Sequence, residues 1–96
     1  MDLMLSEYIT STPGICGGKP CIKGHRIRVQ DVAALTEYQQ QTPVQIAREF
    51  HLSLAEVHAA LVYYYEHLDE IRGQMRQERE RFLKLKAESS SKLRSA

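Results

Sequence analysis

The segment 13–27 most constrains what this chain can fold into, because it is too rich in glycine and proline to form a helix. It reads Pro-Gly-Ile-Cys-Gly-Gly-Lys-Pro-Cys-Ile-Lys-Gly-His-Arg-Ile and holds four glycines, two prolines and two cysteines. Glycine and proline fix the path of a loop, and three basic side chains are held along it. No other part of the 96 residues has such a composition.

Short extended segments are predicted on both sides of this loop. Residues 7–10 have the composition of a brief strand, and residues 26–29, Arg-Ile-Arg-Val, alternate polar and apolar side chains. We expect these two segments to pair as a small sheet. Residues 1–12 would then form an N-terminal arm that contains the first strand.

Helix signals follow the loop. A first helix is expected to begin near Gln30 or Asp31 and to end at the polar run 39–41. Residues 42–45, Thr-Pro-Val-Gln, then combine an N-cap residue, a proline at the first helical position and a capping box. Residues 53–56, Ser-Leu-Ala-Glu, repeat the capping-box pattern and begin a third helix. Two short capped helices joined by a tight turn are typical of a helix-turn-helix.

The third helix carries apolar residues in two series, each with a spacing of seven. The two series form the seam of a coiled coil, interrupted by a glutamate at position 78: Leu54, Val57, Leu61, Tyr64, Leu68, Ile71, Met75, Phe82 and Leu85. We expect this seam to join two copies of the chain, with the dimer interface at Leu61, Tyr64, Leu68 and Ile71. Gly73 costs about 1 kcal/mol of helix stability relative to alanine. The helix is therefore expected to be firm to Ile71, conditional beyond it and disordered over 89–96.

Together these signals predict a mainly α fold. We expect a helix-turn-helix-like core with a short N-terminal β element and a long C-terminal helix. The predicted divisions are the arm at 1–12, a core domain with the basic glycine-rich loop at 13–71, and a basic C-terminal tail, helical or disordered, at 72–96.

Composition narrows the class of protein. The sequence has no apolar run of membrane-spanning length, which predicts a small cytoplasmic domain with no membrane partner, in which the cysteines stay reduced. It has no phosphate-binding loop, catalytic triad or paired carboxylates, so we expect neither enzyme activity nor a cofactor. Four side chains with metal-binding chemistry match no compact zinc spacing, and no metal site is predicted: Cys16, Cys21, His25 and His51. The two cysteines are expected to pack as small apolar side chains.

The basic residues of the loop are the candidates for contact with DNA. The second helix of a helix-turn-helix normally enters the major groove, but residues 53–71 contain carboxylates and no lysine or arginine, and DNA repels such a surface. The candidate phosphate contacts therefore lie on the loop and the strand that follows it: Lys19, Lys23, Arg26 and Arg28. The alternative is that these side chains only keep an exposed sheet edge soluble.

The tail is basic and amphipathic. A segment of this kind can bind an acidic protein partner, a membrane surface or nucleic acid, or it can be a solvated helix extension with no partner. Glu78, Glu80 and a modest apolar face argue against a membrane surface. The candidate residues for a protein partner are Arg72, Met75, Arg76, Arg79, Phe82, Leu83 and Leu85.

Residues 15–29 carry a resemblance to a known family. They read Ile-Cys-Gly-Gly-Lys-Pro-Cys-Ile-Lys-Gly-His-Arg-Ile-Arg-Val and resemble the signature of the domain of unknown function 433 family, which includes VapB-type antitoxins. The likeness continues through the pair of helices. Two positions depart from the family's usual pattern: His25 stands where threonine is usual, and Arg28 where proline is usual. Both add hydrogen-bonding capacity or charge to the end of the loop.

The resemblance implies a function. An antitoxin of this type has an N-terminal domain that dimerises and binds operator DNA, and a tail that folds on a PIN-like, metal-dependent ribonuclease, whose carboxylate cluster an arginine of the antitoxin blocks. We therefore expect the antitoxin of a type II toxin–antitoxin pair that neutralises a PIN-like ribonuclease toxin. Autoregulation of its operon by DNA binding is a further expected role. The alternative is a homodimeric protein-interaction module that has neither DNA nor a toxin as a partner.

Overall fold

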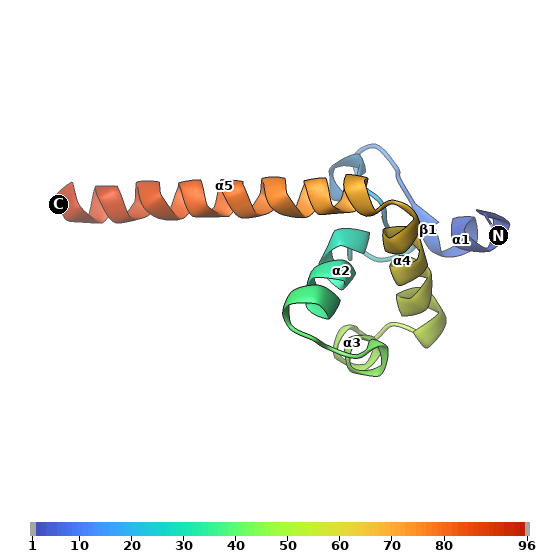
Figure 1. Cartoon of the computed structure of the whole chain (residues 1–96). Coiled ribbons are helices and arrows are strands. Elements are labelled where there is room, and N and C mark those ends of the chain that lie inside the picture. The colour runs from blue at the N-terminus through green and yellow to red at the C-terminus, as the bar shows by residue number, and fades with distance from the viewer. Residues whose placement is uncertain (1, 96) are drawn as a thin grey trace.

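The computed structural model describes residues 2–95, and within that range the side chains of residues 5–89. Over these residues it has a two-stranded antiparallel sheet near the N-terminus and five α-helices, the last of which is long and extends from the body (Figure 1). This confirms the predicted fold class. The elements are, in chain order, α1 (Asp2–Tyr8), β1 (Ile9–Thr10), the 3₁₀ turn η1 (Cys16–Gly18), β2 (Cys21–Ile22), α2 (Val29–Tyr38), α3 (Pro43–Phe50), α4 (Leu54–Glu66) and α5 (Leu68–Ser95).

The sheet pairs differently from the sequence prediction. β1 pairs with β2, with Ile9 opposite Ile22, whereas Arg28 contributes only a single bridge to Cys21. β2 thus lies between β1 and the segment 26–29. The physical reason is burial, because both residues of β2 are apolar and fully excluded from solvent, and a central position covers them on both sides. The arm also begins as helix α1 rather than as an extended segment.

α3 and α4 begin at the residues that the capping boxes predict. The Thr42 hydroxyl accepts a hydrogen bond from the amide of Gln45, whose side chain accepts one from the amide of Thr42. Ser53 and Glu56 exchange the same two bonds at the start of α4. His51, in the left-handed conformation with φ of 57°, closes α3. The two helices form the predicted corner.

The predicted continuous third helix is two helices. α4 ends at Glu66, and His67 has a φ of −131° and a ψ of 45°. Nδ1 of His67 donates to the carbonyl of Tyr63 at 2.9 Å, and the His67 amide donates to the same carbonyl and to that of Tyr64. These bonds satisfy the end of α4. The chain therefore changes direction here, and α5 passes over α2 (Figure 1).

This change of direction places the expected dimer seam inside the chain. Leu61, Tyr64 and Ile71 are 8%, 1% and 0% exposed, and Leu68 packs against the same core. Three of these side chains are covered within one chain and Leu68 is partly buried, so the seam packs largely inside the chain, and association of two copies through it stays a prediction. The seven-residue spacing reflects burial against α2 and the sheet instead.

The core also extends further along the chain than expected. Met75 is 7% exposed and belongs to the core, so the first turns of α5 pack on the body and the boundary at residue 71 lies inside that helix. α5 continues to Ser95 and so includes residues 89–95, which were expected to be disordered. Ala96 lies outside the described residues. No glycine or proline follows Gly73, and most of the later residues have high helix propensity. None of the described helices is both long and apolar enough to cross a membrane.

Ile71→Ala is expected to lower the free energy of unfolding by about 2–4 kcal/mol, because a fully buried side chain leaves a cavity. Leu85→Ala, in the same seven-residue series, should change it by less than about 0.5 kcal/mol, because Leu85 is 56% exposed. Urea denaturation at low and high protein concentration measures both values. Equal effects of the two substitutions would contradict the conclusion that the series is buried at Ile71 and exposed at Leu85, and would favour a continuous seam.

Candidate functional site

The glycine-rich loop presents its basic side chains unequally. Lys23 and Arg26 are exposed, whereas Lys19 is half-buried. Gly24 lies between the two exposed cations with a φ of 81°, a conformation that favours glycine, and it occupies the turn that the amide of His25 closes by donating to the carbonyl of residue 22. The sequence therefore places two adjacent positive side chains at the tip of a defined turn.

Arg28, the fourth basic residue, is engaged within the chain. Its Nη2 donates to Asp31 at 2.8 Å and to Glu78 of α5 at 2.9 Å, and Gln30 donates to the same Glu78 carboxylate at 2.9 Å. These contacts raise the pKa of the Arg28 guanidinium, with the Asp31 hydrogen bond as the largest cause. Glu78, which interrupts the apolar series in the sequence, is thus the residue that fastens α5 to the end of the loop.

A second contact fastens the loop to α4. Nε2 of His25 lies 3.2 Å from Oε2 of Glu56, while the other oxygen of that carboxylate accepts from the amide of Ser53. One carboxylate therefore caps α4 and also holds the loop. The two positions that depart from the usual signature, His25 and Arg28, each place a side-chain nitrogen close to a carboxylate of a helix.

The two cysteines are free thiols in different surroundings. Cys16 is half-buried and Cys21 is fully buried. Burial, together with the neighbouring Cys16 side chain, raises the pKa of the Cys21 thiol to about 11, so it is protonated at neutral pH and is a poor nucleophile. Among the described residues no group of three or more His, Cys, Asp or Glu side chains is placed to hold a metal ion.

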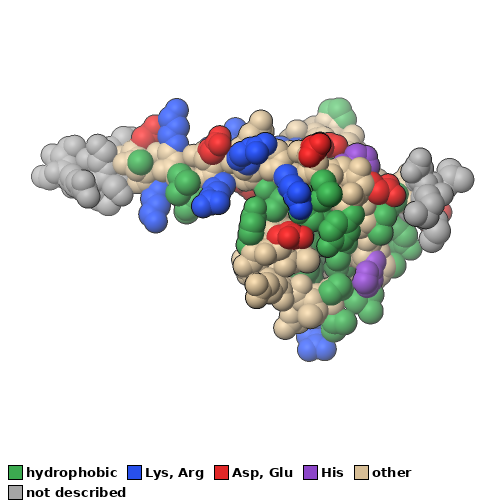
Figure 2. All heavy atoms as spheres, in the orientation of Figure 1, with side chains coloured by type: hydrophobic (Ala, Val, Ile, Leu, Met, Phe, Trp, Pro, Cys, Tyr) green, Lys and Arg blue, Asp and Glu red, His purple; other side chains and the backbone are tan. Residues whose placement is uncertain are grey.

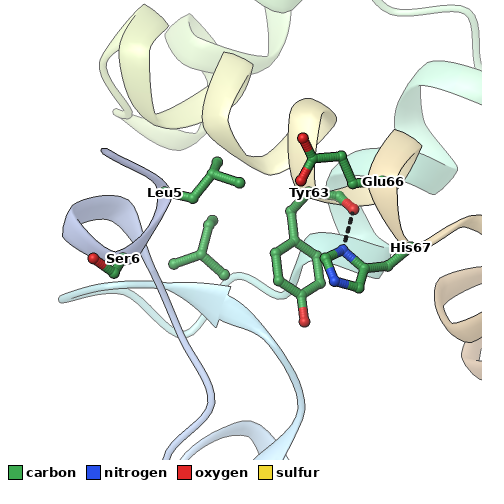
Figure 3. A pocket seen from close by; sticks show the side chains of 6 residues that line it. Leu5, Ser6, Tyr63, Glu66 and His67 are labelled. Atoms are coloured by element: carbon green, nitrogen blue, oxygen red, sulfur yellow. Dashed lines mark hydrogen bonds between the residues drawn. The ribbon is translucent and has the colours of Figure 1, made fainter. Parts of the chain in front are cut away.

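A small open pocket lies between α1 and the end of α4 (Figure 3). The rings of Tyr63 and His67 stack with their centroids 4.0 Å apart, and the hydrogen bond from Nδ1 of His67 fixes its ring. Burial raises the pKa of Tyr63, and Glu70 adds to the shift. These aromatic groups serve to end α4. The pocket is lined by Leu5, Ser6, Ile9, Tyr63, Glu66 and His67.

A longer groove follows the angle between α2 and α5. It consists of two adjoining hollows of about 320 and 380 Å³ that share Tyr38, Met75 and Arg79. Figure 2 shows hydrophobic side chains gathered beneath α5 where it crosses the body, with Lys and Arg side chains along the helix itself. The remaining lining residues are Gln30, Ala34, Glu37, Tyr64, Arg72, Arg76, Glu78 and Phe82.

The seven tail residues that the sequence suggests for contact with a protein partner lie in different surroundings in the structure. Met75 is part of the core, although it also forms the floor of the groove. Three arginines and Phe82 line the groove, while Leu83 and Leu85 lie beyond the body and are 51% and 56% exposed. The arginines are Arg72, Arg76 and Arg79.

Sequence reasoning missed the contribution of α2 to this surface. Tyr38, the last residue of α2, is 68% exposed and lines the groove. Glu37 and Gln30 are the other polar lining residues from α2. The available signal was the position of Tyr38 at the last residue of a helix, directly before a polar run, where little can cover a large ring.

Comparisons with known proteins agree on one family. The model of the family "Protein of unknown function (DUF433)" matches residues 9–64, which is more than half of the chain. The crystal structure of a DUF433 member protein from Anabaena variabilis is similar, with a TM-score of 0.67 and 28% sequence identity over 76% of this chain and 72% of that chain. No curated protein sequence matches this chain. The groove-lining residues of α5 lie beyond the residues that the family model matches.

Glu78→Gln is expected to lower the free energy of unfolding by about 0.5–1 kcal/mol, since the pair with Arg28 is partly exposed and screened by salt. Amide hydrogen exchange around residue 78 should accelerate, because α5 loses its polar attachment to the body. Urea denaturation at low and high salt, with exchange measured by NMR, tests both effects. Exposed Glu80, changed to Gln, is the matched control, and equal effects of the two substitutions would contradict the attachment.

Proposed function

We propose that this chain, which belongs to the DUF433 family, is the antitoxin of a type II toxin–antitoxin pair and neutralises a PIN-like ribonuclease. The observation that carries the proposal is the outer part of α5, which projects from the body (Figure 1). There Phe82, Leu83 and Leu85 are 63%, 51% and 56% exposed. An isolated helix is marginally stable in water, and apolar side chains with no cover inside the chain favour a partner outside it.

The charge of this helix supports an acidic partner. From residue 72 to residue 86, α5 carries six basic side chains and only two acidic ones, and one of those two, Glu78, is paired with Arg28. A metal-dependent ribonuclease presents a cluster of carboxylates, which attracts a basic helix and can accept an arginine. The competing hypothesis, an interaction module with no toxin, uses the same helix on a different partner.

A chain that ends at Glu80 is expected to stay folded and to lose neutralisation of a co-encoded PIN-like ribonuclease. It keeps Met75 in the core and Glu78 on Arg28, but lacks all three exposed apolar side chains. Circular dichroism checks the fold, and rescue of growth during ribonuclease expression checks the function.

Point variants sharpen this test. Leu83→Asp and Leu85→Asp should each weaken the rescue, because a charge would replace an apolar contact with the partner. Val44→Asp on α3, where the valine is 50% exposed, is the matched control and should rescue fully. Full rescue by the shortened chain would remove the outer part of α5 from the mechanism, whereas failure of the full chain to rescue would favour the interaction module.

Binding to operator DNA is a further part of the proposal, and the exposed Lys23 and Arg26 support it. Changing both to alanine is expected to weaken binding to a duplex from upstream of the gene. It should also flatten the salt dependence by about one log unit for each phosphate that a protomer no longer neutralises.

Fluorescence anisotropy over a range of salt concentrations measures both quantities. Arg28→Ala should instead lower stability, because its guanidinium is paired with Asp31 and Glu78. An unchanged salt slope in the double variant would mean that the loop charges do not contact phosphates.

A further inference from the structure

We propose that the groove between α2 and α5 is a docking surface for an acidic amphipathic helix of a partner protein. This inference rests on the proposed function in so far as the partner is the toxin. The proposed function uses the projecting half of α5. The groove adds a second contact, on the body, and α2 contributes Tyr38 to it. The partner would therefore be held at two places, one on the outer helix and one at its root.

The shape and composition of the groove fit one face of a helix. Met75 lies at its floor and is 7% exposed, while Tyr38 and Phe82 border it and are 68% and 63% exposed. Large aromatic side chains beside an apolar floor are the residues that contribute most when a partner covers them. The two hollows adjoin and share Tyr38, Met75 and Arg79 in their linings, so together they extend along α5.

The charge along the groove selects an acidic partner. Arg72, Arg76 and Arg79 are spaced four and three residues apart, so they follow one face of α5. Arg72 is partly oriented already, because its Nε donates to the hydroxyl of Tyr64 at 3.3 Å, and this bond raises the Arg72 pKa.

The acidic residues of the lining do not balance this charge. Glu78 is already paired with Arg28 and Gln30, which leaves Glu37 as the acidic lining residue that forms no side-chain hydrogen bond or ion pair within the described part of the chain. Glu37 already attracts Arg72, which leaves Arg76 and Arg79 without a balancing carboxylate in the lining. Carboxylates brought by a partner helix would complete the charge balance and fix the direction in which that helix binds.

A protein helix fits this surface better than a nucleic acid strand. A phosphate backbone that followed the groove would pass the Glu37 carboxylate, which repels it. An amphipathic helix can turn carboxylates at a spacing of three and four residues toward the arginines. Its apolar face then covers Met75 and Tyr38.

Fluorescence anisotropy with the full chain and three labelled probes tests the proposal. The probes are a synthetic amphipathic helix of leucine and glutamate, the same helix with lysine in place of glutamate, and a short single-stranded RNA. The glutamate helix should bind best. Tyr38→Ala should weaken this binding about tenfold, as expected for a large aromatic contact.

Matched controls separate docking from folding. Leu54→Ala removes an apolar side chain that is 48% exposed at the start of α4 and does not line the groove, and it should leave binding unchanged. Arg79→Glu should weaken binding at least as much as Tyr38→Ala, whereas Arg48→Glu on the exposed surface of α3 should weaken it much less. Circular dichroism of each variant confirms that the fold is retained.

The outcomes distinguish this inference from the proposed function. Tighter binding of the lysine helix or the RNA, or equal effects of Tyr38→Ala and Leu54→Ala, would overturn the docking surface. In that case, rescue by the full chain and failure of the chain that ends at Glu80 would leave the antitoxin proposal standing without the groove. If the glutamate helix binds as expected while the full chain fails to rescue growth, the groove would stand with a different acidic partner.

Discussion

The break between α4 and α5 at His67 determines what every later residue contacts. A straight continuation of α4 would carry Ile71 and Met75 away from the body. The hydrogen bonds from the amide and ring of His67 to the end of α4 let the chain turn, and both side chains then enter the core. The same turn sets α5 across α2 and so forms the groove beside Tyr38. The core, the groove and the projecting helix are therefore three consequences of one local geometry.

The polar contacts at Glu78 fix the direction that the break allows. Apolar packing through Met75 holds the root of α5 but is not directional, whereas the bonds from Arg28 and Gln30 specify where the helix leaves the body. Asp31 caps α2 by accepting from the backbone amide of Arg28, and it also accepts from the Arg28 guanidinium, which therefore joins the loop, α2 and α5.

The sequence predicted the starts of α3 and α4, because the residues that cause each start are close together in the chain. The capping boxes at Thr42 and Ser53 depend on residues three positions apart, and both helices begin where predicted. The seven-residue series did not reveal the break, because its spacing is the same for a seam between two chains and for burial against one's own α2. His67 is neither glycine nor proline and gives no breaking signal of its own. The strand pairing depended on a choice between two nearby segments, and burial of Cys21 decided it. Tyr38 and the α5 arginines meet only through this tertiary arrangement, so the groove had no signature in the sequence.

The family match covers residues 9–64 and stops before the break at His67. The molecule therefore has a part that the family model matches and a part, α5, that it does not. The matched part contains the glycine-rich loop, the sheet and the helices α2 to α4. It does not contain Ile71 or Met75, although these side chains complete the core. A chain limited to the matched residues would leave apolar surface of α2 and α4 in water. The first turns of α5 are thus a structural requirement of the matched part, whereas its outer turns add nothing to that core. Selection on the outer turns can therefore follow a partner with little consequence for folding, and this is where we expect the specificity of the protein to lie.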